Sequence, residues 1–296
     1  MAQLSPDRRY FIGEHGLNAP KAPPGLYIVA TPIGNLKDMT LRGLEILAGV
    51  DLILCEDTRT SAKLLSAYGI KTPRKALHEH NESQMAQHVV QQVQNGQAIA
   101  LISDAGTPLL SDPGFPLVRE AAKSDIDIIA LPGASALLAG LAVAGLPTDQ
   151  FSFLGFLPPK QMAREERLSD LLSRTETLIF YESPKRVAAC LAAMAKIFGA
   201  DRQAVVAREI TKKFETLYRG KLADLASDFD GQSVKGELVI LVQGASAEAA
   251  PDQDEWQAVL AERLKELPLR TAVDEVAQGF GLKRKLVYQV ALEMKK

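Results

Sequence analysis

The stretch that decides the fold runs from Leu101 to Val118 and reads "LISDAGTPLLSDPGFPLV". It begins as the end of an apolar run typical of a buried strand, and it ends in a helical pattern with Pro116 in the first turn. The connection between them is far longer than such a turn needs, and it contains Asp104, Gly106, Pro108, Asp112, Pro113 and Gly114. Two acidic residues in a backbone restricted by prolines indicate a loop shaped for a ligand.

Short apolar runs rich in β-branched residues precede helical patterns throughout the first half of the chain. These runs occupy residues 26–30, 51–55, 98–102 and 126–132. Thr40, Gly69 and Gly96 mark ends of the helices between them. Because strands alternate with helices, we expect an α/β domain whose sheet is largely parallel.

The pattern changes after residue 132, which puts a domain boundary near Pro132 to Ser135. Further apolar runs, from "FSFLGFL" to "GELVILV", predict a second sheet that is interrupted by helices at 161–173 and 184–198. A small, polar and acidic segment then has the composition of a linker. The predicted organisation is a flexible tail at 1–24, α/β domains at 25–132 and 133–244, a linker at 245–255 and a helical unit at 256–296.

The helical unit resembles a helix-turn-helix. Apolar residues recur at helical spacing over 272–277 and again over 286–291. The second helix opens with Lys283, Arg284 and Lys285. The same spacing suits a helical cap or a dimer clasp equally well.

Composition and charge exclude several classes of protein. The 296 residues are 47% hydrophobic with a formal net charge of −2. No apolar run approaches the length of about 18 residues that a membrane span needs, and the first residues do not form a secretory signal. The two cysteines, Cys55 and Cys190, lie in apolar patterns, so we expect no disulfide framework and a cytoplasmic location.

Common catalytic and nucleotide-binding motifs are absent from the sequence. G-x-x-x-x-G-K-[ST] does not occur, and the first strand is followed by "TPIGNL" where a dinucleotide fold needs G-x-G-x-x-G. Serine hydrolases of the α/β type carry the motif G-x-S-x-G, but "GASAL" (133–137) has Leu137 in place of the last glycine, which argues against that class. His78, His80 and Glu82 could face a metal from an extended segment, but H-E-x-x-H is absent and we predict no metal site.

A set of loops after the strands of the first domain remains. These loops are at 31–35, 55–61, 103–114 and 132–136. Gly and Pro also mark ordinary turns, so one such loop alone carries little weight. Because open α/β sheets bind ligands at the carboxyl ends of their strands, the four loops together predict a binding site at that edge.

Longer segments carry a resemblance to a known family. They are "YIVATPIGNLKDMTLRGLEIL", "CEDTRTSAKLL", "LISDAGTPLLSDPGFPLV", "LPGASA", "GFLP", "TLIFYESPKR" and "REITKKFET". Over roughly Gly25 to Gly244, the chain resembles the ribosomal RNA small subunit methyltransferase I family. Porphyrin-modifying members of its superfamily have a G-x-G-type first loop and a short G-D-P, whereas this chain has "TPIG" and "DAGTPLLSDPG".

The resemblance implies a fold, a reaction and partners. The fold is the two-domain α/β fold of the tetrapyrrole methylase superfamily (class III methyltransferases), with a small C-terminal helical, helix-turn-helix-like unit. The reaction is 2′-O-methylation of the ribose of a cytidine in the decoding region of 16S rRNA, with S-adenosylmethionine as methyl donor. The partners are 16S rRNA or the small ribosomal subunit and a second copy of the chain, with no membrane.

The donor site that this resemblance implies agrees with the chemistry of the donor. S-adenosylmethionine presents an ammonium, a carboxylate, a ribose diol and a sulfonium, so its pocket needs a carboxylate, backbone groups and apolar walls. Asp104 is the carboxylate that we favour. The implied donor residues are Pro32, Ile33, Asp104, Leu109, Ser135, Ala136, Tyr181, Ala207 and Leu238. Taken alone, Ala207 and Leu238 would be interpreted as core residues.

The acceptor site is less defined. A ribose hydroxyl is a weak acid, so a general base, or a cation that favours the alkoxide, would help the transfer, and no metal is required. The candidates are Glu56, Asp57, His78, Glu182 and Lys185. The RNA-phosphate candidates are Arg59, Lys63, Lys185, Arg186, Lys212, Lys283, Arg284 and Lys285. "ESPKR" (182–186) also fits a capped helix start in which these charged residues form salt bridges.

Two other functions stay open. A small-molecule methylase of the tetrapyrrole or diphthine type would act without RNA and would not need the helical unit. A ligand-sensing regulator would bind DNA through the C-terminal helices without turnover.

Overall fold

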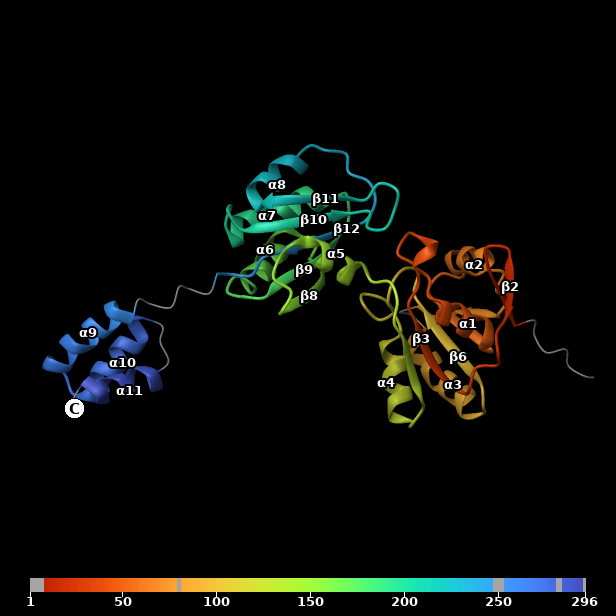
Figure 1. Cartoon of the computed structure of the whole chain (residues 1–296), viewed down its shortest axis with the longest axis horizontal. Helices are drawn as coiled ribbons and strands as arrows, with labels where there is room; N and C mark the ends of the chain where they lie inside the picture. Colours follow the sequence, from red (N-terminus) through yellow and green to blue (C-terminus); the bar gives the residue numbers. More distant parts are fainter. Residues whose placement is uncertain (1–7, 79–80, 247–252, 281–283, 295–296) are drawn as a thin grey trace, which may run out of the picture. The chain divides into compact units, whose positions relative to one another are not determined.

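The computed structural model describes residues 8–78, 81–246, 253–280 and 284–294. It divides into two compact units, one formed by Met1–Leu172 with Glu176–Gln243 and the other by Ser173–Thr175 with Gly244–Lys296. Within the described residues, the first unit contains two five-stranded sheets and a two-stranded hairpin, and the second contains three helices (Figure 1). The C-terminal helices therefore form a unit of their own.

The first sheet is entirely parallel, with the strand order β5-β4-β6-β3-β7. Its strands are β3 (Gly25–Val29), β4 (Leu52–Cys55), β5 (Arg74–Ala76), β6 (Ala98–Ile102) and β7 (Ile128–Leu131). The helices that connect them are η1 (Leu36–Asp38), α1 (Leu41–Gly49), α2 (Thr58–Ala67), α3 (Glu82–Gln94) and α4 (Phe115–Lys123). The alternation of strands and helices predicted from the sequence is confirmed.

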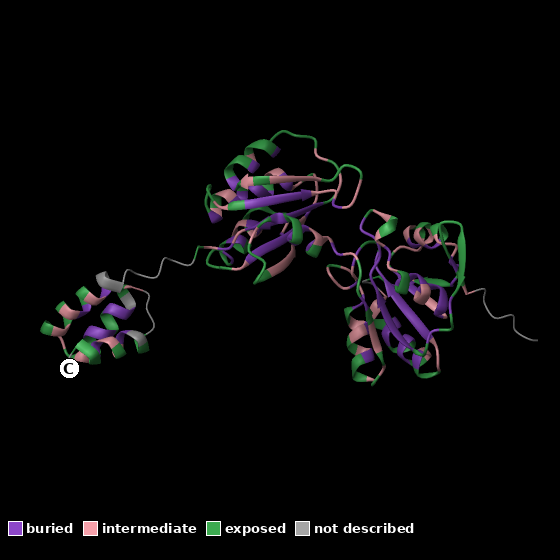
Figure 2. Cartoon of the chain, in the orientation of Figure 1, coloured by how far each residue is buried: buried purple, intermediate pink, exposed green. Residues whose placement is uncertain are grey.

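Helices cover both faces of this sheet. Tyr27 and Val29 of β3 belong to a core that α1 and α2 also line. Leu26 and Ile28, which alternate with them, belong to a second core that α3 and α4 line. Burial on both faces explains why these strands are continuous apolar runs in the sequence, and Figure 2 shows them buried along their length.

Local signals in the sequence also fix the helix ends. The Thr40 hydroxyl accepts a hydrogen bond from the Gly43 N–H at 3.0 Å and caps α1. Gly69 and Gly96 follow α2 and α3 with φ of 66° and 89°, a conformation that favours glycine. β5 was not predicted, because its three residues, "RKA", are mostly exposed at the edge of the sheet.

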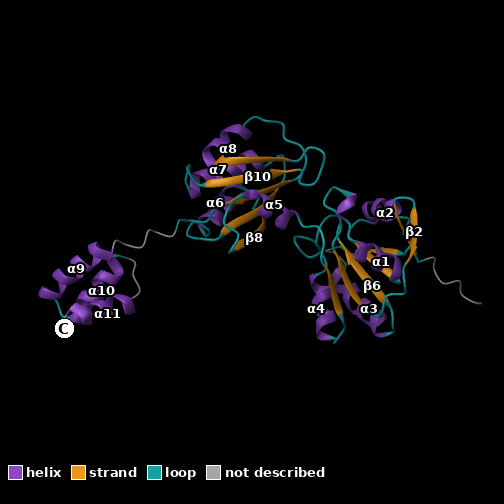
Figure 3. Ribbon diagram, in the orientation of Figure 1, coloured by secondary structure: helices purple, strands orange, loops and turns teal. Residues whose placement is uncertain are grey.

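The second sheet is mixed, with the strand order β11-β10-β12-β9-β8. Its strands are β8 (Phe151–Phe156), β9 (Thr177–Glu182), β10 (Gln203–Arg208), β11 (Thr216–Lys221) and β12 (Leu238–Val242). Only the β8–β9 pair is parallel among the described strands of this sheet. Its helices are α5 (Ala136–Ala144), α6 (Gln161–Ser169), α7 (Val187–Phe198) and α8 (Leu222–Phe229), drawn in Figure 3.

Alternation along β12 again separates two cores. Leu238 and Ile240 pack with α6, α7 and α8 on one face of the sheet. Val239 and Leu241 pack with α5 on the other face. Ile33, which follows β3, also belongs to the core of α5, so this core joins the second sheet to a loop of the first.

The N-terminal segment is not the flexible tail that we expected, at least over residues 8–24. Strands β1 (Arg9–Ile12) and β2 (His15–Asn18) form an antiparallel hairpin. Tyr10 is buried against the first domain, and Arg8 forms an ion pair with Asp51 at 3.0 Å. The hairpin was missed because its strands are only four residues long and mostly exposed. Residues 1–7 lie outside the described residues.

The helical unit contains α9 (Gln253–Glu266), α10 (Leu269–Gly279) and α11 (Arg284–Met294). Trp256, Leu260, Val273 and Val287 form its core. The predicted linker at 245–255 extends past the start of α9 at Gln253, so its C-terminal bound was too late. Residues 247–252 lie outside the described residues. Among the described residues, the structure contains no helix that is long and apolar enough to cross a membrane.

Candidate functional site

The loops that follow β3, β6 and β7 are held together by hydrogen bonds. Thr31 and Gly106 exchange two backbone hydrogen bonds of 2.9 Å, and the Thr31 hydroxyl donates to the Ser103 carbonyl at 3.1 Å. The Thr107 hydroxyl donates to the Ala134 carbonyl at 3.3 Å. Because the strands are parallel, their carboxyl ends lie at one edge, and the predicted convergence of these loops is found.

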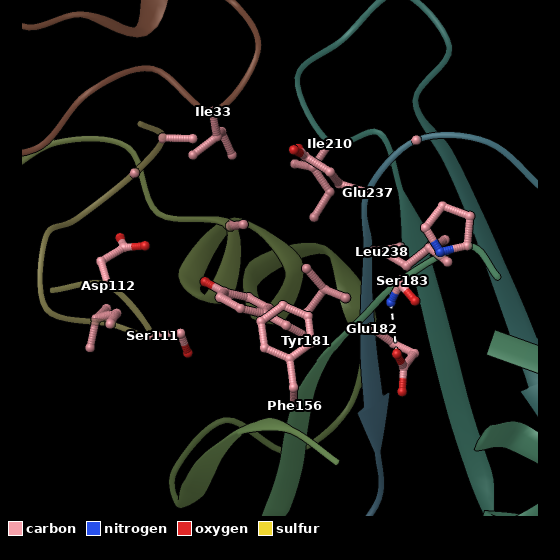
Figure 4. A pocket seen from close by; sticks show the side chains of 18 of the residues that line it. Ile33, Ser111, Asp112, Phe156, Tyr181, Glu182, Ser183, Ile210, Glu237 and Leu238 are labelled. Atoms are coloured by element: carbon pink, nitrogen blue, oxygen red, sulfur yellow. Dashed lines mark hydrogen bonds between the residues drawn. The ribbon is translucent and has the colours of Figure 1, made fainter. Parts of the chain in front are cut away.

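A pocket of about 340 Å³ opens between these loops and the second sheet (Figure 4). Its apolar lining includes Ile33, Leu110, Tyr181 and Val239. Ile33 and Val239 are 7% and 4% exposed, so the inner walls are set by the packing of the fold. A largely apolar pocket with few polar groups is the usual form of a small-molecule site.

The structure brings together some of the predicted donor residues. Those that line the pocket are Ile33, Ala136, Tyr181, Ala207 and Leu238. Ala207 and Leu238 line the pocket and are also core residues, and their role toward the donor stays a prediction. The predicted donor residues that are not part of the lining are Pro32, Asp104, Leu109 and Ser135.

These other residues have identifiable structural positions. Pro32 is buried beside Ile33, and the Ser135 hydroxyl caps α5 by accepting a hydrogen bond from the Leu138 N–H. The Leu109 side chain packs into the core with α3 and α4. Asp104 is exposed, and its carboxylate accepts a hydrogen bond from the Asp57 N–H at 3.2 Å, which links the loops after β4 and β6.

Asp112 is the carboxylate of the long loop that lines the pocket, whereas the sequence favours Asp104 for this position. Asp112 is half-buried. Burial raises the pKa of Asp112 to about 6, and the negative charge of Glu56 adds to the rise, whereas the nearby Ser103 hydroxyl acts to lower the pKa. Asp112, the second acidic residue of the loop, was visible in the sequence as part of "SDPG", but spacing alone could not rank it above Asp104, the first.

The loop that carries Asp112 has an unusual backbone. Leu109 and Ser111 have φ of 76° and 72°, values that residues other than glycine rarely adopt. The Gly114 N–H donates a 2.6 Å hydrogen bond to the Glu82 carboxylate at the start of α3. Strained residues held by their surroundings are common at functional sites.

Glu182, which lines the pocket, forms a buried ion pair. It is 3% exposed, and its carboxylate accepts hydrogen bonds from the Ser183 N–H at 2.8 Å and from the Arg186 guanidinium at 3.2 Å. Arg186 also donates to the Leu157 carbonyl, and α7 begins only at Val187. The sequence "ESPKR" (182–186) also suggested salt bridges among its charged residues. Glu182 and Arg186 form such a salt bridge, whereas Lys185 is exposed.

The Asp57 side chain interacts with the first turn of α2, the helix that it precedes. Its carboxylate accepts the Arg59 N–H at 2.7 Å, caps α2 and pairs with the Arg59 guanidinium at 3.0 Å. The side-chain hydrogen bond from Arg59 lowers the pKa of Asp57. Glu56 and His78 are exposed, and the Asn81 side chain accepts the backbone N–H of His78 at 2.9 Å.

Neither the histidines nor the acidic residues form a metal site in the described part of the chain. No group of three His, Cys, Asp or Glu side chains there has an arrangement that could hold a metal ion. Glu82 binds the backbone of Gly114, as described above, and His80 lies outside the described residues.

Some of the predicted RNA-phosphate residues form ion pairs within the protein, and others are exposed. Lys212 forms 2.8 Å ion pairs with Glu209 and Glu237, and Arg186 is held by Glu182. Both are poorer candidates for phosphate binding than the exposed side chains of Lys63 and Lys185.

The helical unit has a basic hollow of its own, of about 580 Å³. It is lined by Arg270, Arg284, Lys285 and Tyr288, from α10 and α11. Arg284 forms an ion pair with Asp274, and Lys285 is exposed. Lys283 lies outside the described residues. Arg270 and Tyr288 were not predicted, because they lie apart from the basic run in the sequence.

Two family models match this chain. Residues 25–226 match the Tetrapyrrole (Corrin/Porphyrin) Methylases, and residues 250–295 match the RsmI C-terminal HTH domain. The ribosomal RNA small subunit methyltransferase I of Pasteurella multocida is 48% identical over 272 residues, which cover 90% of this chain and 96% of the relative. The protein of the same name from Vibrio cholerae is 46% identical, over 93% of this chain and 96% of its own.

Solved structures share the fold at low sequence identity. The methyltransferase CobJ matches with a TM-score of 0.57 and 18% identity, over 75% of this chain and 95% of its own. Uroporphyrin-III C-methyl transferase from Thermus thermophilus, complexed with S-adenyl homocysteine, matches with a TM-score of 0.50 and 15% identity, over 73% of this chain and 96% of its own. These similarities establish the architecture.

Proposed function

The chain belongs to the ribosomal RNA small subunit methyltransferase I family, and from this premise we propose that it 2′-O-methylates the ribose of a cytidine in the decoding region of 16S rRNA. The methyl donor is S-adenosylmethionine. Relatives of this family match nine-tenths of the chain, and a separate family model matches the helical unit. That match favours an rRNA substrate over a small-molecule methylase or a DNA-binding regulator.

The pocket is the observation that carries this proposal. Its volume of about 340 Å³ is at the lower end of the range for small-molecule sites. The pocket is not enclosed, so part of a bound ligand can extend out of it. Apolar walls around Ile33 and Val239 suit the adenine and the methylene groups of the donor, while Asp112 offers a carboxylate to its positive charges. The residues present therefore fit the donor, which supplies a methyl group on a positively charged sulfur.

The chain has two tasks in such a transfer. The first is to align donor and acceptor in a site from which water is excluded, because the reaction destroys a positive charge. The buried walls of the pocket serve this task. The second is to take the proton of the acceptor hydroxyl.

We assign the proton-accepting role to Asp112. Glu182 is already engaged in its ion pair with Arg186, and the hydrogen bonds from Arg59 lower the pKa of Asp57. The charges that act on Asp112 are instead the carboxylates of Glu56 and Asp104, and its raised pKa lies closer to neutral pH. A carboxylate with such a pKa is better matched to general-base catalysis at neutral pH than an ordinary aspartate.

RNA binding is assigned to exposed cations in each unit. Lys63 and Lys185 are the exposed lysines of the predicted set in the α/β unit. In the helical unit, Arg270, Lys285 and Tyr288 line the basic hollow, where cations and an aromatic ring suit phosphates and bases.

Two copies of the chain complete the proposed enzyme. The inner side of α5 packs on its own sheet through Leu137 and Leu141, but Leu138 and Val143 are 53% and 39% exposed. An apolar outer side on a helix of small residues suits close packing against a second copy. Light scattering at micromolar concentration should give the mass of a dimer, and a monomer would contradict this part of the proposal.

The proposed reaction is tested by mapping rRNA nucleosides in a strain from which the gene is deleted. Mass spectrometry of 16S rRNA fragments should reveal the loss of one methyl group from a decoding-region cytidine, restored by a plasmid copy. An unchanged 16S rRNA would reject the assignment, and a loss of methylated tetrapyrroles would favour the small-molecule alternative.

A further inference from the structure

Strand β8 contains an irregularity at the edge of the pocket. Along β9, Ile179 and Tyr181 are two residues apart, but their partners on β8, Phe153 and Phe156, are three residues apart. The extra residue falls beside Gly155, which has φ of 62°. This is a β-bulge in a parallel pair, and bulges next to active sites commonly redirect a side chain.

The bulge changes the face of the sheet to which Phe156 points. Leu154 packs against the core of α6, α7 and α8. By simple alternation, Phe156 would point to that same core. With one residue inserted, it instead shares the pocket face with Phe153 and Tyr181 and lines the pocket.

Three aromatic rings consequently meet on this face. The Tyr181 ring centroid is 4.8 Å from that of Phe153 and 5.8 Å from that of Phe156, and both contacts are edge-to-face. Tyr181 is half-buried, but Phe156 is 55% exposed. Figure 4 shows the Phe156 and Tyr181 rings beside one another in the pocket. The fold thus supports one side of the Phe156 ring and leaves much of its surface to solvent.

The bulge also lies against the loop that carries Asp112. A Cβ placed on Gly155 would be 3.5 Å from the Ser111 hydroxyl, one residue before Asp112. The exposed ring and the proposed proton acceptor are therefore carried by backbone segments in close contact. In one nucleotide, the base and the ribose 2′-hydroxyl are likewise neighbours.

We propose that the Phe156 ring is the platform on which the base of the acceptor nucleotide stacks. The proposal rests on the rRNA methylation proposed above. Sequence-specific recognition of RNA usually places unpaired bases on aromatic side chains, and enzymes that modify nucleotides draw their target out of the stack. A base on Phe156 directs its own ribose toward Asp112. The donor's adenine needs no exposed ring, because the walls near Ala207 and Val239 are buried.

The test compares Phe156→Ala with Phe151→Ala. Phe151 is a suitable control because it lies on the same strand, is 41% exposed and is not part of the pocket lining. We expect Phe156→Ala to lower kcat/KM for small subunits by about 10- to 100-fold, which is the usual loss for one stacked base. Donor affinity, measured by calorimetry, should stay within about twofold of the parent.

A binding measurement without turnover complements the kinetics. Phe156→Trp keeps an aromatic platform, and the native Trp256 is 3% exposed in the separate helical unit. A decoding-region oligonucleotide should quench the fluorescence of the new indole, whereas the donor alone should not. The same variant should retain most of the activity that Phe156→Ala loses.

Three results would overturn the platform. They are equal kcat/KM for Phe156→Ala and Phe151→Ala, no quenching of the Phe156→Trp indole by RNA, and loss of donor affinity in Phe156→Ala, which would assign the ring to the donor's adenine. If the parent enzyme methylated no RNA at all, the proposed function itself would fail, so the two failures are distinct.

Discussion

Replacing Asp112 with asparagine should make the protein more stable and far less active at neutral pH. The carboxyl has a pKa of about 6 in the fold against an ordinary value of 3.8, because burial disfavours its charged form. The folded state therefore binds the proton more tightly than the unfolded chain. Ionisation of Asp112 costs no stability below about pH 4, costs progressively more between about pH 4 and 6, and costs the full amount above about pH 6.

The size of the effect follows from the shift and from the exposure of the side chain. The rise in the pKa of Asp112 from 3.8 to about 6 corresponds to roughly 3 kcal/mol, since a tenfold change in an equilibrium constant is about 1.4 kcal/mol. Asp112 is only half-buried, so solvent screening reduces this to about 1 kcal/mol. Asparagine keeps the shape without the charge. Asp112→Asn should therefore be more stable than the parent by about 1 kcal/mol at pH 7.5 and equal to it near pH 4.

Urea unfolding of both proteins at pH 4, 5, 6 and 7.5 measures this difference directly, provided that both unfold in two states. Methyl transfer to small subunits at pH 7.5 should fall by about 100- to 10,000-fold in the variant, the usual loss when a general base is removed. A variant that is less stable at pH 7.5, or a stability difference that does not depend on pH, would refute the environment described for Asp112. A fully active variant would refute its role as the base.

Three further predictions concern the donor site, the buried ion pair and the helical unit. Asp104→Ala should leave donor affinity within about twofold of the parent in calorimetry, because Asp104 is exposed and does not line the pocket; a loss of about 1.5 to 3 kcal/mol, the size of a charge-assisted hydrogen bond, would instead place Asp104 at the donor. Arg186→Met should lower the free energy of unfolding by about 3 kcal/mol at neutral pH, because it leaves the Glu182 carboxylate buried without its partner. The double variant with Glu182→Gln should regain part of the lost stability. Equal stability of the single and double variants would show that this ion pair is not coupled. Replacing Lys283, Arg284 and Lys285 with alanine should reduce the log–log salt slope of RNA binding by roughly 2 to 3 without changing donor affinity; loss of donor affinity with RNA binding intact would identify the unit as a structural clasp.

The strands of the first domain could be predicted because burial on both faces makes them continuous apolar runs. β6, at Ala98–Ile102, is fully buried and was predicted at its observed bounds. The hairpin at residues 9–18 and the edge strand β5 lack this signal, since most of their side chains are exposed. Their formation depends on contacts with distant residues, such as that of Arg8 with Asp51.

The location of the pocket was predictable, but the residues that line it were not all predictable. Four loops at the carboxyl ends of parallel strands predicted the edge at which the pocket lies, because that consequence of topology is general. Spacing could not reveal that Asp112 rather than Asp104 lines the pocket, which depends on positive φ at Leu109 and Ser111. Phe156 was missed for a similar reason, because alternation assigns it to the opposite face unless the bulge is known.

Methyl transfer by the purified protein to isolated small ribosomal subunits tests the central claim most directly. The subunits would come from a strain lacking this enzyme, and the donor would be S-adenosylmethionine with a labelled methyl group. We predict one labelled methyl group per subunit, recovered after digestion as a 2′-O-methylated cytidine from the decoding region. Label recovered on a base or on a ribosomal protein, or no label in the RNA while a tetrapyrrole is methylated under the same conditions, would contradict the claim.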